Sequence, residues 1–172
     1  MIALIVANIL LFIASIIGVY NGYLKDKKRI IINHSINLIL SLISYLLLGG
    51  YSGAIICFAG LLRNFLAYNE RLDWPTKILL IAVAGALIVS FNNYGLVGYF
   101  PLINFAVYTS IIDTKNMLLF KRVCAFNCIL SGLYNFVLFA FSAFAFNVIT
   151  LIMNLIAIYQ IKYKNINKMK KI

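Results

Sequence analysis

Apolar residues dominate this chain in long, continuous runs that short polar or basic segments interrupt. A helix of about 20 apolar residues crosses the hydrocarbon core of a bilayer, which is ~30 Å thick. The runs do not alternate between apolar and polar positions, as the strands of an outer-membrane barrel do. The pattern therefore predicts an all-α integral membrane protein whose seven transmembrane helices lie at about 2–22, 30–49, 52–69, 75–92, 96–113, 118–140 and 143–162.

The composition agrees with this prediction and decides how the charge is interpreted. Hydrophobic residues make up 64% of the chain and charged residues 11%, a balance too apolar for a soluble domain of this length. A net charge of +11 invites a nucleic-acid partner, but basic loops beside anionic lipid headgroups are ordinary in membrane proteins. We therefore expect membrane lipids as partners and no nucleic acid.

The placement of the basic residues predicts the orientation of the chain. With seven spans, the basic loops at 25–29, 71–77, 115–122 and 162–171 all fall on one side of the membrane. Lys and Arg are enriched in cytoplasmic loops. We expect a multi-pass protein of the bacterial cytoplasmic (inner) membrane, with the N-terminus outside, the C-terminus in the cytoplasm and a basic cytoplasmic tail at 164–172.

An internal repeat predicts the domain organisation. Residues 37–67 align without a gap with residues 127–157, and nine of the 31 pairs are identical, where about two or three are expected by chance. Two three-helix units of the same orientation need one extra crossing to join them. We therefore predict two parallel three-helix repeats around a connecting helix (3+1+3), related by an axis along the membrane normal, at 1–70, 71–94 and 95–163.

Two repeated amides are the main candidates for a substrate site. Asn64 lies about 12 residues into the third span, a little past the midplane at ~1.5 Å per residue, and Asn154 reaches the same depth in the seventh span. The repeat would place them opposite each other at the repeat interface, where transporters of repeated architecture bind substrates. Amides offer donors and acceptors without net charge, which suits a neutral polar solute. Alternatively, both amides only join helices by hydrogen bonds.

Arg63 is the exceptional charge, because it lies inside a predicted span. Its head group can extend towards the cytoplasm or pair with Glu70, two turns away. The functional alternative is a cation that lines an inner vestibule, where it recognises an anion or excludes cations.

The remaining pathway or gating candidates are three amides and a proline. Asn37 and Asn127 are repeat mates nearer the cytoplasm, and helix joining is favoured for both, whereas Asn104 lacks an identical mate. Pro101 lies early in the fifth span, where a residue without a backbone donor is expected to kink the helix and help the second repeat bend.

An enzyme is not expected from these residues. All four acidic residues lie at the cytoplasmic boundary, so paired carboxylates and proton relays within the membrane have no support. His34 is the only histidine, and its position near a helix start favours an interfacial or packed side chain. Cys124 and Cys128 share a helical face, but two thiolates alone make no zinc site. We expect no catalytic residue, no metal and no cofactor.

The sequence resembles the bacterial inner-membrane YgjV family over most of its length. The resemblance is clearest at Gly50-Tyr51-Ser52-Gly53-Ala54 leading to Leu62-Arg63, and at Leu151-Ile152-Met153-Asn154. It implies a small seven-helix protein of the inner membrane and no particular activity. More distantly, the 3+1+3 pattern with an Asn in the third helix of each repeat is similar to the SWEET-type sugar transporters. That resemblance implies substrate contacts at Asn64 and Asn154, although only Pro101 matches the core prolines of those transporters.

Together these features favour a passive facilitator for a small neutral polar solute that works by alternating access between two three-helix units. Passive transport is preferred because no acid is expected within the membrane. The alternative is a noncatalytic membrane interaction or scaffold protein with no transport pathway. Assembly into a homo-oligomer is compatible with either function.

Overall fold

The computed structural model describes residues 2–21, 27–112, 114 and 116–169. Over these residues all regular secondary structure is helical, which confirms the all-α prediction. The basic positions 25, 115, 170 and 171 and the acidic positions 26 and 113, used above to predict the orientation and the boundary, lie outside the described residues. The α-helices are α1 (Ile2–Asn21), α2 (Lys27–Leu47), α3 (Tyr51–Tyr68), α4 (Trp74–Phe91), α5 (Phe100–Ile111), α6 (Met117–Val137) and α7 (Phe141–Met169).

The fifth segment differs from the prediction of seven full spans. Six of the described helices are long and apolar enough to cross a membrane, whereas Gly95–Ile111 is a shorter apolar segment. It consists of a 3₁₀ helix, η1 (Gly95–Tyr99), followed by α5. Because a 3₁₀ helix rises about 2.0 Å per residue and an α-helix about 1.5 Å, the segment still extends roughly 28 Å.

Pro101 and Gly98 explain this change of helix type. Pro101 lies in the first turn of α5, where backbone N–H groups have no helical partner, so it removes no hydrogen bond from the interior of an α-helix. Gly98 packs against the Asn92 side chain so closely that a Cβ atom would lie 1.7 Å from its Oδ1 atom. The Asn92 amide in turn donates to the Gly95 carbonyl at 2.7 Å. The segment is thus folded tightly at its start.

Helix α4 begins at a capped turn outside the apolar segment. The Asp73 carboxylate accepts a hydrogen bond from the Thr76 backbone N–H at 3.0 Å and another from the Thr76 hydroxyl. These bonds favour the charged carboxylate and lower the pKa of Asp73. Asp73 is therefore the N-cap of α4.

The α2–α3 and α6–α7 turns are built alike, ninety positions apart. Gly49 and Phe139 both adopt a positive φ, of 70° and 56°. In the first turn the Gly50 N–H donates to the Tyr45 carbonyl at 2.8 Å, and in the second the Ala140 N–H donates to the Asn135 carbonyl at 2.9 Å. Both turns close a helix through a left-handed residue.

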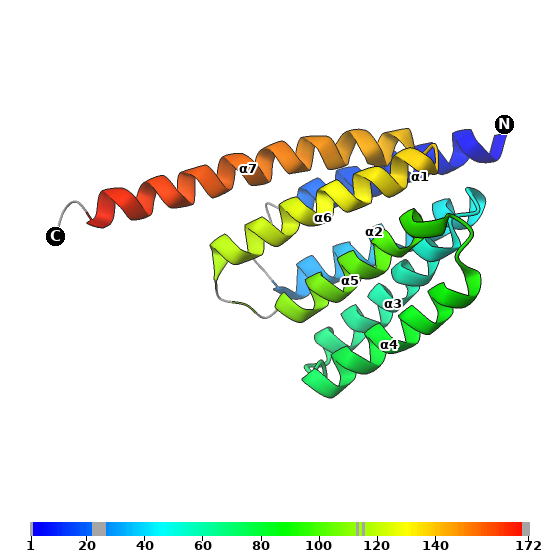
Figure 1. Cartoon of the computed structure of the whole chain (residues 1–172), viewed down its shortest axis with the longest axis horizontal. Helices are drawn as coiled ribbons and strands as arrows, with labels where there is room; N and C mark the ends of the chain where they lie inside the picture. Colours follow the sequence, from blue (N-terminus) through cyan, green and yellow to red (C-terminus); the bar gives the residue numbers. More distant parts are fainter. Residues whose placement is uncertain (1, 22–26, 113, 115, 170–172) are drawn as a thin grey trace.

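The helices form a bundle in which each helix contacts the next one in sequence. Two further contacts close it, one between α1 and α7 and one between α3 and α5. Figure 1 shows α1, α6 and α7 along one side, α3 and α4 along the other, and α2 and α5 between them. Many large apolar side chains point outwards, among them Val89 at 69% exposure, as expected of helices that face lipid.

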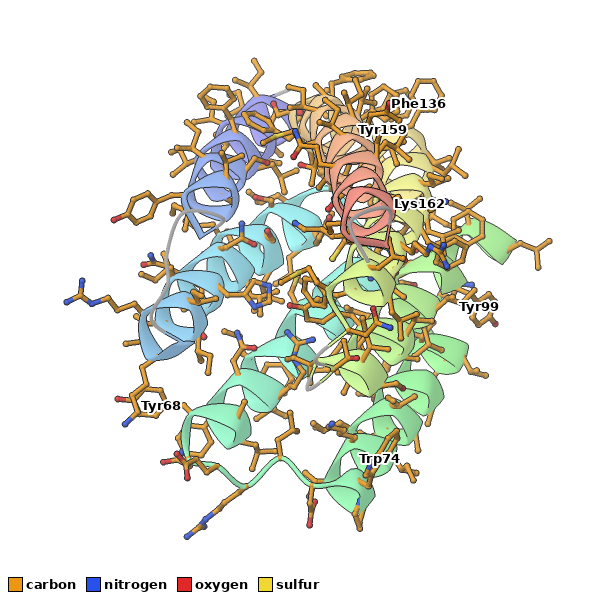
Figure 2. The ribbon with its side chains drawn as sticks, turned by 90° about the vertical axis from the view of Figure 1, so that its left-hand side faces the viewer. Tyr68, Trp74, Tyr99, Phe136, Tyr159 and Lys162 are labelled. Carbon is orange, nitrogen blue, oxygen red and sulfur yellow. The ribbon has the colours of Figure 1, made fainter. Side chains whose placement is uncertain are left out.

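The two ends of the bundle differ in charge. The basic end is the end where α1, α3 and α5 finish, and among the described residues it carries segments 27–29, 69–77 and 116–122. The uncharged end carries the turns 48–50, 92–94 and 138–140, which contain no charged residue. Tyr68 and Trp74 are exposed at the basic end, which faces the viewer in Figure 2. Aromatic residues in such positions are typical of a membrane interface.

Candidate functional site

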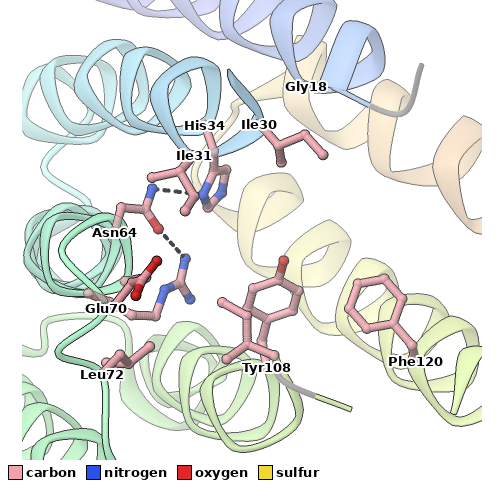
Figure 3. A pocket seen from close by; sticks show the side chains of 12 residues that line it. Gly18, Ile30, Ile31, His34, Asn64, Glu70, Leu72, Tyr108 and Phe120 are labelled. Carbon is pink, nitrogen blue, oxygen red and sulfur yellow. Dashed lines mark hydrogen bonds between the residues drawn. The ribbon is translucent and has the colours of Figure 1, made fainter. Parts of the chain in front are cut away.

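A cavity of about 640 Å³ lies at the basic end of the bundle. Its walls come from α1, α2 and α3 on one side and from α5 and α6 on the other, and we call it the basic-end cavity (Figure 3). Ile, Leu, Ala, Gly and Phe residues form its apolar surface. Its polar lining residues are His34, Arg63, Asn64, Glu70 and Tyr108.

Arg63 is a buried cation in the wall of this cavity, with 3% of its surface exposed. Its Nη2 atom donates to the Asn64 Oδ1 atom at 3.1 Å, and its guanidinium carbon lies 5.6 Å from the Phe105 ring centre and 5.0 Å from that of Tyr108. Its buried Nε atom has no hydrogen-bond partner. Burying an ion costs roughly several kcal/mol, which one neutral amide and two ring faces offset only in part.

The surroundings of Arg63 differ from the default prediction. Its head group does not extend to the outside of the bundle, and among the described residues it forms no ion pair with Glu70, although both line the cavity. Glu70 is exposed and has a φ of 58° just after the end of α3. The charge of Arg63 is thus held inside without an ion pair to any carboxylate in the described part of the chain.

Asn64 holds Arg63 and His34 in fixed positions. Its amide oxygen accepts from Arg63, while its Nδ2 atom lies 3.0 Å from the His34 Nδ1 atom and donates to the Ser35 Oγ atom at 3.2 Å. Figure 3 draws the bonds to Arg63 and His34 as dashed lines. Both ends of the amide are therefore used by α2 and α3.

This arrangement decides which nitrogen of His34 carries a proton. A guanidinium only donates, so it fixes the oxygen of Asn64 towards Arg63 and the NH₂ group towards His34. The His34 Nδ1 atom must then accept, which leaves the neutral ring with its proton on Nε2. His34 lines the cavity, so this N–H is a donor available to a ligand there.

Tyr108 completes the polar wall from the other side of the bundle. It reaches from α5 towards His34 on α2 (Figure 3). Its ring lies over Arg63 on one side, and its centre is 6.1 Å from that of Phe120 on α6. Tyr108 therefore links the cation to the second half of the chain.

Packed side chains fill the uncharged end. At their centre are Tyr45, Tyr134, Asn135 and Gly53, which we call the tyrosine cluster. The Tyr45 hydroxyl donates to the Asn135 Oδ1 atom at 2.9 Å, and the Gly53 N–H donates to the Tyr134 hydroxyl at 2.8 Å. The two tyrosine rings meet edge to face at 5.8 Å. Leu11, Leu138 and Ala140 are buried around them.

Gly53 allows the tyrosine cluster to pack this closely. A Cβ atom at this position would lie 2.9 Å from ring carbons of both Tyr45 and Tyr134. Since real side-chain contacts are longer, any other residue would push the two rings apart. The sequence therefore specifies a closed arrangement at this end.

Of the two amides predicted to form one substrate site, the structure places only Asn64 at the basic-end cavity. Asn64 lies four residues before the end of α3, or about 6 Å from it. Asn154 is buried in α7, donates to the Thr150 carbonyl at 2.9 Å and contacts Cys128 of α6. Asn64 lines the basic-end cavity and Asn154 does not.

Two of the three other predicted amides, Asn37 and Asn104, join neighbouring helices. Asn37 of α2 donates to the Ala14 carbonyl of α1. Asn104 of α5 donates to the Ser131 hydroxyl at 2.7 Å and to the Asn127 carbonyl at 3.3 Å, both on α6. The Oδ1 atoms of Asn104 and Asn127 are buried without a hydrogen-bond partner. None of these amides, nor Pro101, lines the basic-end cavity.

Sequence reasoning missed the partners that define both ends. His34 was expected to be only packed or interfacial, and Tyr108, Tyr45 and Tyr134 carried no signal among so many aromatic residues. One clue was present: Tyr45 and Asn135 lie ninety positions apart, at equivalent places in the predicted repeats. The described residues contain no group of three His, Cys, Asp or Glu side chains that could hold a metal.

Comparison with known proteins identifies a family for most of the chain. The family model Imp-YgjV, described as bacterial inner membrane protein, matches residues 5–165. No curated protein and no solved structure matches the chain.

Proposed function

The chain belongs to the Imp-YgjV family of bacterial inner membrane proteins, and we propose that it is a facilitator that moves a small polar solute across this membrane by alternating access. The observation that carries the proposal is the contrast between the two ends of one bundle. A cavity of about 640 Å³ is present at the basic end, while hydrogen-bonded tyrosines fill the uncharged end. A transporter caught in one of its two states has this form.

Alternating access needs two halves that can move against each other, and the contacts support such a division. If the halves are the 3+1+3 repeats, an offset of ninety exchanges α1 with α5 and α3 with α7. The contact of α1 with α7 then becomes the contact of α5 with α3, and both are present. The same offset exchanges Tyr45 with Asn135, and these two residues are hydrogen-bonded to each other. Two equivalent residues that touch must lie close to the axis that relates the two repeats.

The proposed direction of opening follows from charge. By the positive-inside rule, the basic end faces the cytoplasm, the N-terminus lies outside and the cavity opens inwards. Opening of the tyrosine cluster would then give access from the outside. We propose passive transport, because the acidic residues of the sequence are confined to positions 26, 70, 73 and 113, at or beyond the ends of the predicted spans.

Thiol labelling tests the one-sided opening and the orientation together. In a variant without Cys57, Cys124 and Cys128, one cysteine replaces Ala67, which lines the cavity, or Ala143, which is buried beside the tyrosine cluster. A charged maleimide that does not cross membranes should label Ala67→Cys from the cytoplasmic side only. It should leave Ala143→Cys unlabelled while the tyrosine cluster is closed and label it from the outside when that cluster opens.

Transport itself is tested in liposomes that contain the purified protein. Uptake of radiolabelled glycerol, acetate and phosphate should exceed that of empty liposomes for at least one solute, and Gly53→Ala should change the rate, because it disturbs closure. A protein that moves none of a wider solute panel and protects Ala67→Cys from label would instead be the noncatalytic interaction protein.

A further inference from the structure

Arg63 is a buried cation that forms no ion pair with any residue that the structure describes. It is 97% buried, its Nε atom lacks a partner, and its one hydrogen bond goes to a neutral amide. Glu70 lines the same cavity, but its exposed carboxylate forms no ion pair with Arg63 and is screened by water and salt at the rim. A cation in such a position favours an anion in the space beside it.

Asn64 is unsuited to bind a solute itself, although it was the predicted contact. Its oxygen is occupied by Arg63 and its NH₂ group by His34 and Ser35. The amide therefore acts as a positioning residue for the guanidinium and for the His34 ring. This changes the expected solute, since the prediction of a neutral solute relied on a free pair of amides.

We propose that the basic-end cavity binds an anionic group, a carboxylate or a phosphate, with Arg63 as the charged contact and His34 and Tyr108 as further donors. Guanidinium groups bind both anions through paired, charge-assisted hydrogen bonds. The imidazole N–H and the phenol hydroxyl come from α2 and α5, so the anion would join the two halves of the bundle.

The second half of the chain offers no matching charge, so one anion is expected and not two. The positions ninety residues after His34 and Arg63 are Cys124 and Met153, which carry no comparable donors. In contrast, the cavity residues Gly18 and Tyr108 are ninety positions apart and so are equivalent in the two repeats. The cavity therefore lies close to the proposed axis between the repeats.

The anion has two possible sources, a soluble solute or a lipid headgroup. If the source is a soluble solute that the protein moves, the inference rests on the proposed function and identifies the solute as an anion. A lipid source is suggested by an apolar groove of about 390 Å³ between α2 and α3, which shares Ile31 and Asn64 with the basic-end cavity. The chemistry at Arg63 is the same for both, and the experiment separates them.

The first test measures binding of sodium phosphate and sodium acetate to the whole protein in a neutral detergent, by calorimetry and by the shift in Tm. Glycerol serves as the uncharged control. Phosphate or acetate should raise Tm and glycerol should not, and Arg63→Gln should weaken anion binding at least tenfold. The matched control is Arg122→Gln, which removes the same charge from an exposed position at the same end and should change binding less than twofold.

Asn64→Asp keeps the test decisive if Arg63→Gln does not fold. The new carboxylate would lie where the amide oxygen now accepts from Arg63, so it should supply the missing anion from within the protein. We expect this variant to fold with an unchanged or higher Tm in anion-free buffer and to lose the Tm response to phosphate. A variant that keeps the full response would overturn the proposal, as would equal binding by Arg63→Gln.

Nanodiscs distinguish the two sources. For a lipid headgroup, phosphatidylglycerol should raise Tm above that in phosphatidylcholine, and it should block phosphate binding in an Arg63-dependent way. For a soluble solute, phosphate or acetate should bind equally well in both lipids. Anion binding without flux in liposomes would reject the proposed function but keep this site, whereas flux of glycerol without any anion binding would reject the site and keep the function.

Discussion

The two ends of this bundle are made from similar helices but are packed in opposite ways. At the uncharged end, Tyr45 and Tyr134 meet edge to face, and their hydroxyl groups have partners at 2.9 and 2.8 Å. At the basic end, Arg63 and His34 border a cavity of about 640 Å³. The polar groups of the uncharged end are therefore hydrogen-bonded within the protein, whereas the cation and donors of the basic end are left for a ligand.

The packed uncharged end stabilises the fold, whereas the basic end is where a ligand would be selected. Close packing and satisfied hydrogen bonds stabilise a bundle, and a hollow with a buried charge does not. A hollow is therefore best explained by a ligand that completes it. Substitutions at either end test this contrast, and they are expected to change the free energy of unfolding by different amounts.

The largest effect is expected from Gly53→Ala, because the new methyl group would meet both tyrosine rings at 2.9 Å. Overpacking of this kind costs about 2–3 kcal/mol. Denaturant unfolding in detergent should show this loss, and Ala143→Cys should become accessible to maleimide from the uncharged end. Gly85→Ala is the control, since its Cβ atom would lie 3.6 Å from Leu102 and the change should stabilise α4 by about 0.5–1 kcal/mol. A tolerated Gly53→Ala with unchanged labelling would contradict a closed cluster.

A smaller loss is expected from Tyr134→Phe. The Gly53 N–H lies in the first turn of α3, where no helical partner exists, so removal of the hydroxyl leaves it unpaired in a buried place. The expected cost is about 1–2 kcal/mol. Tyr94→Phe removes a longer bond, of 3.4 Å to the Leu48 carbonyl, and should cost less. Equal stability of the two variants would show that the Tyr134 hydroxyl contributes nothing special.

At the basic end, a larger side chain should be tolerated. Ala67→Leu would extend into the basic-end cavity, so the free energy of unfolding should change by less than about 0.5 kcal/mol, in contrast to the overpacking at Gly53. The same change should weaken phosphate binding, while Ala67→Ser should not. A loss as large as that of Gly53→Ala would mean that the cavity is closed in solution.

The smallest effect concerns Asp73, which is exposed outside the bundle. Its pKa is lowered in the folded state by the bonds from Thr76, so its contribution to stability is present above pH ~4 and is lost as the pH falls through the folded pKa. Wild-type Tm should therefore decline slightly more between pH 5 and pH 3 than that of Asp73→Asn, which caps α4 without titrating. Parallel pH profiles of Tm for the two proteins would show that the Asp73 carboxylate makes no such contribution.

Much of the fold was predictable from the sequence because it depends on local pattern. Six of the seven predicted spans correspond to helices that are long and apolar enough to cross a membrane. The exception was also local in origin, since Pro101 and Gly98 favour a 3₁₀ start to the fifth segment. The ends of the third span were predicted to within one residue, since 52–69 was expected and α3 is Tyr51–Tyr68.

The candidate site was only partly predictable. Arg63 was recognised as unusual from its position inside an apolar run, and one of its two suggested roles, a cation lining a vestibule, agrees with its place in the cavity wall. That Asn64 would be occupied by His34 and Ser35 could not be predicted, because hydrogen-bond partners on another helix depend on how helices rotate against each other.

The sequence by itself determined the class of protein, the helices and the charged and uncharged ends, because hydropathy and charge act along the chain. Only the tertiary structure decided which end is hollow. The same bundle places Tyr45 against Asn135 at one end and the Arg63 guanidinium against the Tyr108 ring in the wall of a cavity at the other. These pairs are 90 and 45 positions apart, so their contact depends on the packing of whole helices and not on any local pattern.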